Sequence, residues 1–210
     1  TVLDVNPIWT QITTLTGGAI KCLAICKGHP NILAYSVSNK FFITHNALDP
    51  MPMFTSVNFP ISGTATDIAI SSMDTNKVFV VLGSKVYLSA DGGTNFTNYS
   101  GTLPAINHTK IYLQEYGTIF NLYLGNPLGV YFRSNGMSDW INYSGDLPSI
   151  ATIKDMLYFN DGGEDARLYV TYYGRGTWET KLEQSSTTCG IPVLHTVQVN
   201  ASTIQVGWSN

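Results

Sequence analysis

The chain has 210 residues, which is enough for one all-β domain or for one domain and part of a second. Hydrophobic residues make up 44% of it, enough for a buried core, but charged residues make up only 12%, against about a quarter in ordinary soluble domains. The net charge of −3 and the 11 Lys plus Arg argue against a nucleic-acid or anionic-membrane partner. Since no apolar run reaches about 18 residues, we also expect no membrane insertion.

A repeat of about 44 residues is the most informative feature. The phrase Phe96-Thr-Asn-Tyr-Ser-Gly-Thr-Leu-Pro104 returns 44 positions later as Trp140-Ile-Asn-Tyr-Ser-Gly-Asp-Leu-Pro148. Weaker copies begin at Phe54 and at Trp9. Self-similarity at this period with strand-like content is typical of a β-propeller, in which each repeat forms one four-stranded blade. The sequence therefore predicts an all-β fold of antiparallel blades.

Alternating apolar residues predict the strands of each repeat. In chain order, the first repeat has strands at 20–26, 32–37, 40–44 and 53–58, and the second has strands at 67–72, 77–82, 85–89 and 96–100. The third has strands at 110–115, 121–124, 129–134 and 140–143. The last repeat has strands at 153–159, 167–172 and 176–182, and it lacks a fourth strand.

The segment 8–13 is a fourth strand without a blade of its own, because it precedes the first full repeat. A closed ring of blades leaves no free sheet edge. The segment closes this ring if the ring has four blades; otherwise it belongs to a further blade upstream. We favour the second interpretation, in which the ring is incomplete.

The domain organisation follows from these patterns. Residues 1–182 are predicted to form the propeller blades, and residues 183–188 a polar linker. Residues 189–199 and 202–208 alternate like two strands, and with Pro192 and Trp208 they resemble the start of a fibronectin type III domain. We therefore expect 189–210 to be an incomplete domain of that kind, and other domains of the same polypeptide to be partners.

One turn of the second repeat resembles a known motif. Ser89-Ala-Asp-Gly-Gly-Thr-Asn-Phe96 is similar to the Asp-box, or BNR repeat, of sialidases, sortilin-like Vps10 domains and xyloglucan-cleaving glycosidases. We expect Asp91 to accept hydrogen bonds from its own turn, Gly93 to adopt a conformation closed to other residues, and Phe96 to anchor the returning strand. Ser89 opens the motif. These roles are structural, so the motif indicates fold and not chemistry.

The phrase Tyr173-Gly-Arg-Gly-Thr-Trp-Glu-Thr-Lys-Leu182 resembles the closing blade of large secreted proteins of Bacteroidota. In those proteins, propellers with this motif often precede fibronectin-like domains. The resemblance implies a secreted or cell-surface location.

Few acidic residues are placed for catalysis. Glycosidases use two carboxylates about 5–9 Å apart, and Asp67 and Asp155 fall near the start of first strands, which line a propeller's channel. They are the candidate catalytic pair, although we favour the interpretation that both are ordinary acids at strand ends without a catalytic role.

Other residues are candidates for binding. Tyr112, Tyr116, Tyr172 and Tyr173 could offer stacking faces to sugar rings, although tyrosines of this kind are common in half-buried strands. Three acids of one hairpin loop could hold Ca²⁺ but lack the spacing of a calcium loop: Asp161, Glu164 and Asp165. We favour the interpretation that this loop is a solvent-exposed turn, and we expect the protein to bind no metal and no cofactor.

Together these features predict an extracellular recognition or scaffold region of a large secreted or cell-surface protein, with a glycan or a surface protein as its ligand. The alternative is a xyloglucan-type glycoside hydrolase with carboxylates facing the channel. A sortilin-like receptor is disfavoured, because the cysteine-rich module that follows such propellers is absent from this sequence.

Overall fold

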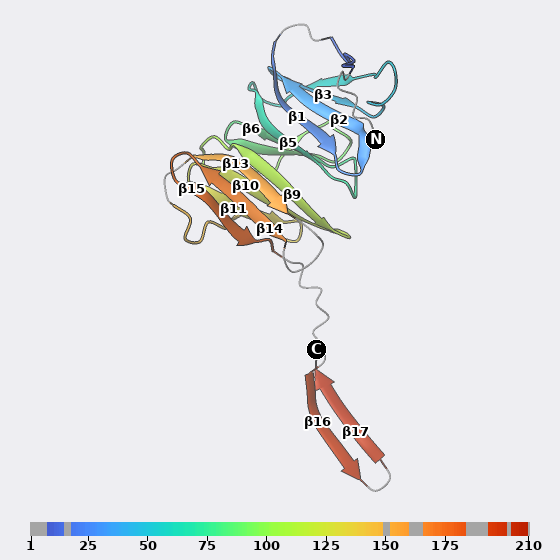
Figure 1. Cartoon of the computed structure of the whole chain (residues 1–210), viewed down its shortest axis with the longest axis vertical. Helices are drawn as coiled ribbons and strands as arrows, with labels where there is room; N and C mark the ends of the chain where they lie inside the picture. Colours follow the sequence, from blue (N-terminus) through green and yellow to red (C-terminus); the bar gives the residue numbers. More distant parts are fainter. Residues whose placement is uncertain are drawn as a thin grey trace.

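A computed structural model describes residues 8–14, 18–148, 152–159 and 166–183 with their side chains, and the backbone of two further strands at 193–200 and 203–209. Every regular element in these ranges is a β-strand (Figure 1). The all-β prediction is confirmed.

Successive strands pair antiparallel into sheets that we call blades 1 to 4. Blade 1 comprises β1 (Ile20–Cys26), β2 (His29–Val37), β3 (Lys40–Thr44) and β4 (Thr55–Asn58), and blade 2 comprises β5 (Ala65–Ile70), β6 (Val78–Leu82), β7 (Lys85–Ser89) and β8 (Thr97–Asn98). Blade 3 comprises β9 (Lys110–Tyr116), β10 (Ile119–Asn126), β11 (Gly129–Ser134) and β12 (Ile141–Asn142). Blade 4 has three strands: β13 (Ile153–Phe159), β14 (Arg167–Tyr172) and β15 (Gly176–Lys181).

Two more strands, β16 (Val193–Asn200) and β17 (Thr203–Ser209), form a separate antiparallel pair. Residues 184–189, which hold most of the predicted linker and the predicted start of the next domain, lie outside the described residues, so the fibronectin-like domain stays a prediction.

The fourth strands of blades 2 and 3 end earlier than the sequence predicts, and a serine in each explains why. The backbone N–H of Val86 donates to Ser100 Oγ at 2.9 Å, and that of Val130 donates to Ser144 Oγ at 3.1 Å. Because a hydroxyl takes the place of a backbone carbonyl there, the ladder of β8 and of β12 ends early.

Apolar clusters fill the boundaries between successive blades, and an aromatic residue leads the fourth strands of blades 2 and 3 into them. Phe96 of blade 2 packs against Phe41 of blade 1, with ring centroids 5.3 Å apart. Trp140 of blade 3 packs at the next boundary and donates its indole N–H to the Tyr99 carbonyl at 2.9 Å. These two aromatic anchors hold β8 and β12 against the preceding blades.

The first strands of successive blades contact one another, β1 with β5, β5 with β9 and β9 with β13. Three of the four carry a β-bulge at the same place, just before Cys22, Asp67 and Asp155. A bulge re-aims the side chain that follows it. These three residues therefore occupy equivalent positions on the inner strands.

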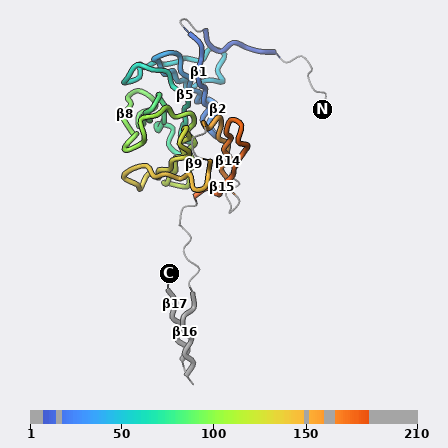
Figure 2. The backbone as a smooth tube through the Cα atoms, turned by 90° about the vertical axis from the view of Figure 1, so that its left-hand side faces the viewer, coloured from blue at the N-terminus to red at the C-terminus, as the bar shows by residue number. Residues whose placement is uncertain are grey.

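Blade 4 has no fourth strand among the described residues, as the sequence predicts. The orphan segment 8–14 forms no strand here, and it lies at the end of the blades far from β15 (Figure 2). Its Trp9 is 91% exposed.

Candidate functional site

A cavity of about 400 Å³ opens where the inner strands of the four blades converge, and we call it the four-blade hollow. Every blade contributes to its wall. The lining residues are Lys27, Gly28, His29, Ser72, Met73, Tyr112, Leu113, Glu115 and Tyr158. Since these residues are spread over more than 130 positions of the chain, only the packed blades create the hollow.

Two tyrosines form an aromatic platform in this hollow. The rings of Tyr112 (β9) and Tyr158 (β13) stack with centroids 3.7 Å apart and planes inclined by 19°. Tyr112 is only 8% exposed, whereas Tyr158 is 40% exposed, so the buried ring supports the accessible one. The ammonium of Lys27 lies 5.8 Å from the centroid of Tyr158. The platform therefore combines an apolar face with a nearby cation.

Glu115 of β9 also lines the hollow. Its carboxylate accepts hydrogen bonds from the backbone N–H of Ser72 at 2.8 Å and from Ser72 Oγ at 2.6 Å, and another from Ser71 Oγ. These bonds join the end of β9 to the end of β5. The carboxylate is therefore a positioning group that holds the 71–73 turn of blade 2 at the rim.

His29 holds the same turn from blade 1. Its Nε2 lies 3.1 Å from the carbonyl oxygen of Ser72. Since a carbonyl only accepts, this contact places a proton on Nε2.

The candidate catalytic acids lie on the inner strands on either side of Lys110. Asp67 Oδ2 accepts a hydrogen bond from the backbone N–H of Ile111 at 2.9 Å, and Asp155 Oδ1 lies 3.4 Å from Lys110 Nζ. Burial raises the pKa of Asp67, and the hydrogen bond from Ile111 partly opposes that rise. Each carboxylate thus has a structural partner: Asp67 ties blade 2 to blade 3, and Asp155 ties blade 4 to blade 3.

Hydrogen bonds within the Ser89–Phe96 turn hold the Asp91 carboxylate in place. Asp91 Oδ1 accepts from the backbone N–H of Asn95 at 2.8 Å and from Ser89 Oγ at 2.7 Å, and Oδ2 accepts from Asn95 Nδ2 at 2.7 Å. The bonds from Asn95, followed by that from Ser89, lower the pKa of Asp91 to about 2. Ser89 Oγ also accepts from the backbone N–H of Gly93 at 2.8 Å. The carboxylate is therefore a turn-forming group that leads the chain into the Phe96 anchor.

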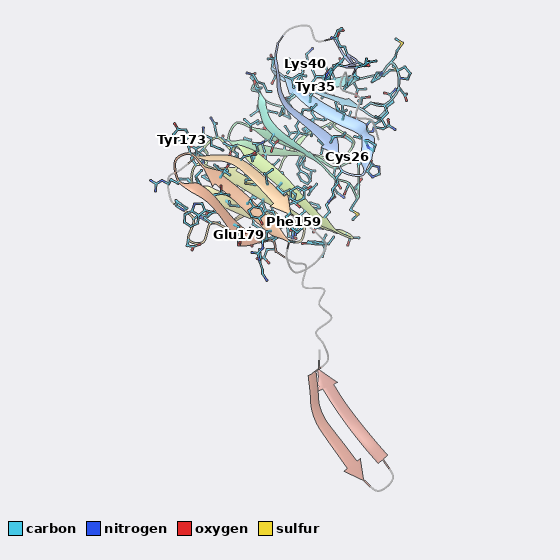
Figure 3. All side chains as sticks on the ribbon, viewed as in Figure 1. Cys26, Tyr35, Lys40, Phe159, Tyr173 and Glu179 are labelled. Carbon is cyan, nitrogen blue, oxygen red and sulfur yellow. The ribbon has the colours of Figure 1, made fainter. Side chains whose placement is uncertain are left out.

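The structure separates the four candidate tyrosines. Tyr112 lies in the hollow but is mostly buried, and Tyr116 donates its hydroxyl to the Glu183 carbonyl at 3.0 Å. Tyr172 is 5% exposed and belongs to the core between blades 3 and 4, so it has no face to offer a ligand. Tyr173 is 81% exposed, at the end of blade 4 opposite Phe159 and therefore away from the hollow (Figure 3).

Sequence reasoning missed Tyr158, the accessible ring of the platform. Its strand reads Ile-Lys-Asp-Met-Leu-Tyr-Phe, in which nothing distinguishes a ligand-facing ring from a core ring. Lys27 and His29 were also missed, because they lie in and beside a hairpin turn without a motif.

The metal candidates Asp161, Glu164 and Asp165 lie outside the described residues. Within the described ranges, no cluster of three or more His, Cys, Asp or Glu side chains is arranged to hold a metal ion. The same ranges contain no helix long and apolar enough to cross a membrane.

No family model and no curated protein matches this chain. Among solved structures it is similar to an ancestral GH74 enzyme, with a TM-score of 0.62 and 14% identity. The fold is that of a β-propeller. The similarity covers 77% of this chain but only 25% of the GH74 chain, so the chain spans about a quarter of that protein's length.

Two further structures are similar at lower scores. A GH74 enzyme from Niastella koreensis gives a TM-score of 0.45 and 13% identity over 80% of this chain and 30% of its own. YCF48 from Cyanidioschyzon merolae gives 0.46 and 10% over 95% of this chain and 74% of its own.

Proposed function

We propose that this chain is an extracellular recognition region that binds carbohydrate at the four-blade hollow. The observation that carries the proposal is the half-exposed Tyr158 ring, held flat by Tyr112 at the edge of a cavity. The extracellular location rests on the low charge content and on the resemblance of residues 173–182 to closing blades of secreted proteins. The Asp-box assignment of 89–96 belongs to the same proposal.

The chemistry of the hollow suits a sugar. The C–H face of a sugar ring packs on an aromatic ring, and its hydroxyls need nearby donors and acceptors. Lys27 supplies a charged donor beside Tyr158, and the polar side chains of His29 and Glu115 line the same cavity. A volume of about 400 Å³ lies in the usual range for small-ligand sites, about 300–1,000 Å³. The ligand is therefore a short oligosaccharide or the end of a longer glycan.

Hydrolysis of a xyloglucan-type polysaccharide is the second candidate. Two observations support it: Asp67 and Asp155 both lie on inner strands, and burial raises the pKa of Asp67, as a general acid requires. However, Asp67 is engaged by Ile111 and Asp155 by Lys110. Because both carboxylates have structural partners, binding is favoured over catalysis.

Titration calorimetry of the whole chain against xyloglucan oligosaccharides and a panel of neutral and acidic glycans tests the binding function. We expect at least one glycan to bind, and Tyr158→Ala to weaken that binding by about ten-fold or more. Tyr173→Ala is the matched control, since Tyr173 is also exposed and lies 5.6 Å from a lysine ammonium, that of Lys154, but outside the hollow. Equal losses in both variants, or no binding across the panel, would contradict the proposal.

The catalytic alternative has its own readout, the release of reducing ends from xyloglucan. Turnover that Asp67→Asn and Asp155→Asn each abolish, without loss of glycan binding, would replace recognition by hydrolysis as the function.

A further inference from the structure

The cation of the four-blade hollow belongs to a turn that two hydrogen bonds fix in place. Lys27 lies in the hairpin between β1 and β2, whose flanking residues Cys26 and His29 pair across the two strands. Cys26 Sγ donates to the carbonyl of Ser71 at 3.3 Å, and His29 Nε2 lies 3.1 Å from the carbonyl of Ser72. Because the residues on both sides of Lys27 contact the same turn of blade 2, its flexible side chain starts from a fixed point at the rim.

The carboxylate of the hollow is already engaged within the protein. Glu115 Oε2 accepts from the backbone N–H and the hydroxyl of Ser72 at 2.8 and 2.6 Å, and Oε1 accepts from Ser71 Oγ. Since both oxygens are bonded to the 71–72 turn, donors of blade 2 compensate the negative charge of Glu115. This carboxylate therefore does not serve as the counterion of Lys27.

The Lys27 ammonium is the unpaired charge of the hollow. Within the ranges that the structure describes, no acidic side chain lies within ion-pair distance of it. Its neighbour is the ring of Tyr158, with the ammonium 5.8 Å from the ring centroid. A ring face attracts a cation but replaces a counterion only in part. An anion bound here would gain a charge-assisted hydrogen bond without breaking an existing ion pair.

An acidic sugar fits both the ring and the cation. In a hexuronate the carboxylate is attached directly to the pyranose ring, so that charge and ring lie next to each other, as Lys27 and Tyr158 do. The C–H face of the sugar packs on Tyr158, and the carboxylate accepts from the three N–H donors of the ammonium. The long stem of Lys27 lets the ammonium move to the edge of the ring when a sugar covers the ring face. A neutral sugar would use the platform but leave the ammonium unpaired.

We propose that the ligand of the four-blade hollow is a hexuronate unit of an acidic polysaccharide, with its ring on Tyr158 and its carboxylate on Lys27. This inference rests on the proposed function, since it requires that the hollow binds carbohydrate. It adds the chemical class of the sugar, and it makes Lys27 the residue that determines specificity for that class.

Titration calorimetry of the whole chain against matched pairs of ligands is the test. One member of a pair is a short oligogalacturonate, and the other is the same oligomer with its carboxyls methyl-esterified, which keeps the rings and hydroxyls but removes the charge. Oligomannuronate and oligoglucuronate are paired with their esters in the same way, since Lys27 and Tyr158 select a carboxylated ring. We expect at least one acid to bind about ten-fold or more tightly than its ester, because only the acid forms a charge-assisted hydrogen bond.

Lys27→Met removes the charge and keeps most of the stem. It should weaken binding of the acid by about ten-fold or more and leave binding of the ester unchanged, so that the two ligands bind alike. Retained ester binding and an unchanged melting temperature show that the variant is folded. Tyr158→Ala, by contrast, should weaken both ligands.

Lys154→Met is the matched control. The Lys154 ammonium has the same relation to an aromatic ring, 5.6 Å from the centroid of Tyr173, but it lies outside the hollow. This variant loses the same charge from the protein as a whole, so it corrects for general attraction between a cation and an anionic ligand. It should leave binding of both the acid and the ester unchanged.

The outcomes separate this inference from the proposed function. If every acid binds no more tightly than its ester, or if Lys27→Met and Lys154→Met weaken the acid equally, Lys27 does not select a carboxylate. The inference is then overturned, while carbohydrate binding at the hollow stands. Tighter binding of neutral xyloglucan oligosaccharides than of every uronate overturns it as well. If no glycan binds at all, the proposed function itself fails.

Discussion

Glu115 at the end of β9 accepts two hydrogen bonds from Ser72, 43 positions earlier and one blade away, at 2.8 and 2.6 Å. This pair joins two inner strands at the rim of the four-blade hollow, and His29 of blade 1 contacts the carbonyl of the same serine. The rim is therefore a network of three blades, and the platform of Tyr112 and Tyr158 lies beside it.

Glu115→Gln removes the charge from this network and retains the shape of the side chain. Since hydrogen bonds to a charged acceptor contribute about 1.5–3 kcal/mol, we expect the free energy of unfolding in urea to fall by about 1–3 kcal/mol. Glu179→Gln is the control, because Glu179 forms an exposed ion pair with Arg167 and should cost less than about 1 kcal/mol. Equal effects in the two variants would show that the network adds nothing to stability.

His108 makes stability depend on pH. Its ring is fully buried, and this burial lowers its pKa from 6.5 to about 4. The folded protein therefore binds fewer protons than the unfolded chain, so stability falls as the pH drops through 6.5 and continues to fall until about 4. We expect a loss of about 2 kcal/mol by pH 5. Urea unfolding at several pH values measures this loss of stability. If His108→Gln leaves the dependence of stability on pH unchanged, His108 is not its cause.

Asp91 acts in a lower pH window. Hydrogen bonds from Asn95 and Ser89 lower its pKa to about 2, so its stabilising effect is complete above the unfolded value of 3.8 and is lost as the pH falls towards 2. An NMR titration of the Asp91 side-chain carboxyl should give a midpoint well below that of an unperturbed aspartate. A midpoint at 3.8 or above would mean that the turn does not bind the carboxylate in solution.

Gly93→Ala tests the Ser89–Phe96 turn in another way. Gly93 has φ of +89°, and an added Cβ would clash with the ring of Phe41. We expect a loss of more than about 2 kcal/mol, from backbone strain together with displacement of a buried ring. Gly117→Ala separates the two causes, because Gly117 has φ of +52° but open space around it. Thermal unfolding should show the larger loss for Gly93→Ala; similar losses would assign the whole effect to φ.

The sequence by itself determined the strands, their grouping into blades and the anchors, because these depend on local patterns. Alternation within a few residues predicts strands such as β1 and β7 with their observed bounds. The 44-residue period places Phe96 and Trp140 at the same point of successive blades. Where a side chain replaced a backbone partner, as Ser100 does for Val86, the predicted strand was too long.

The candidate sites were decided only by the tertiary structure. Tyr158 becomes a platform because Tyr112 of another blade stacks beneath it, and Tyr172 becomes a core residue because blade 3 covers it. Asp67 acquires Ile111 as its partner only when β5 lies beside β9. The stacking of blades brings together residues dozens of positions apart, and the period of the strands contains no information on which side chains meet there.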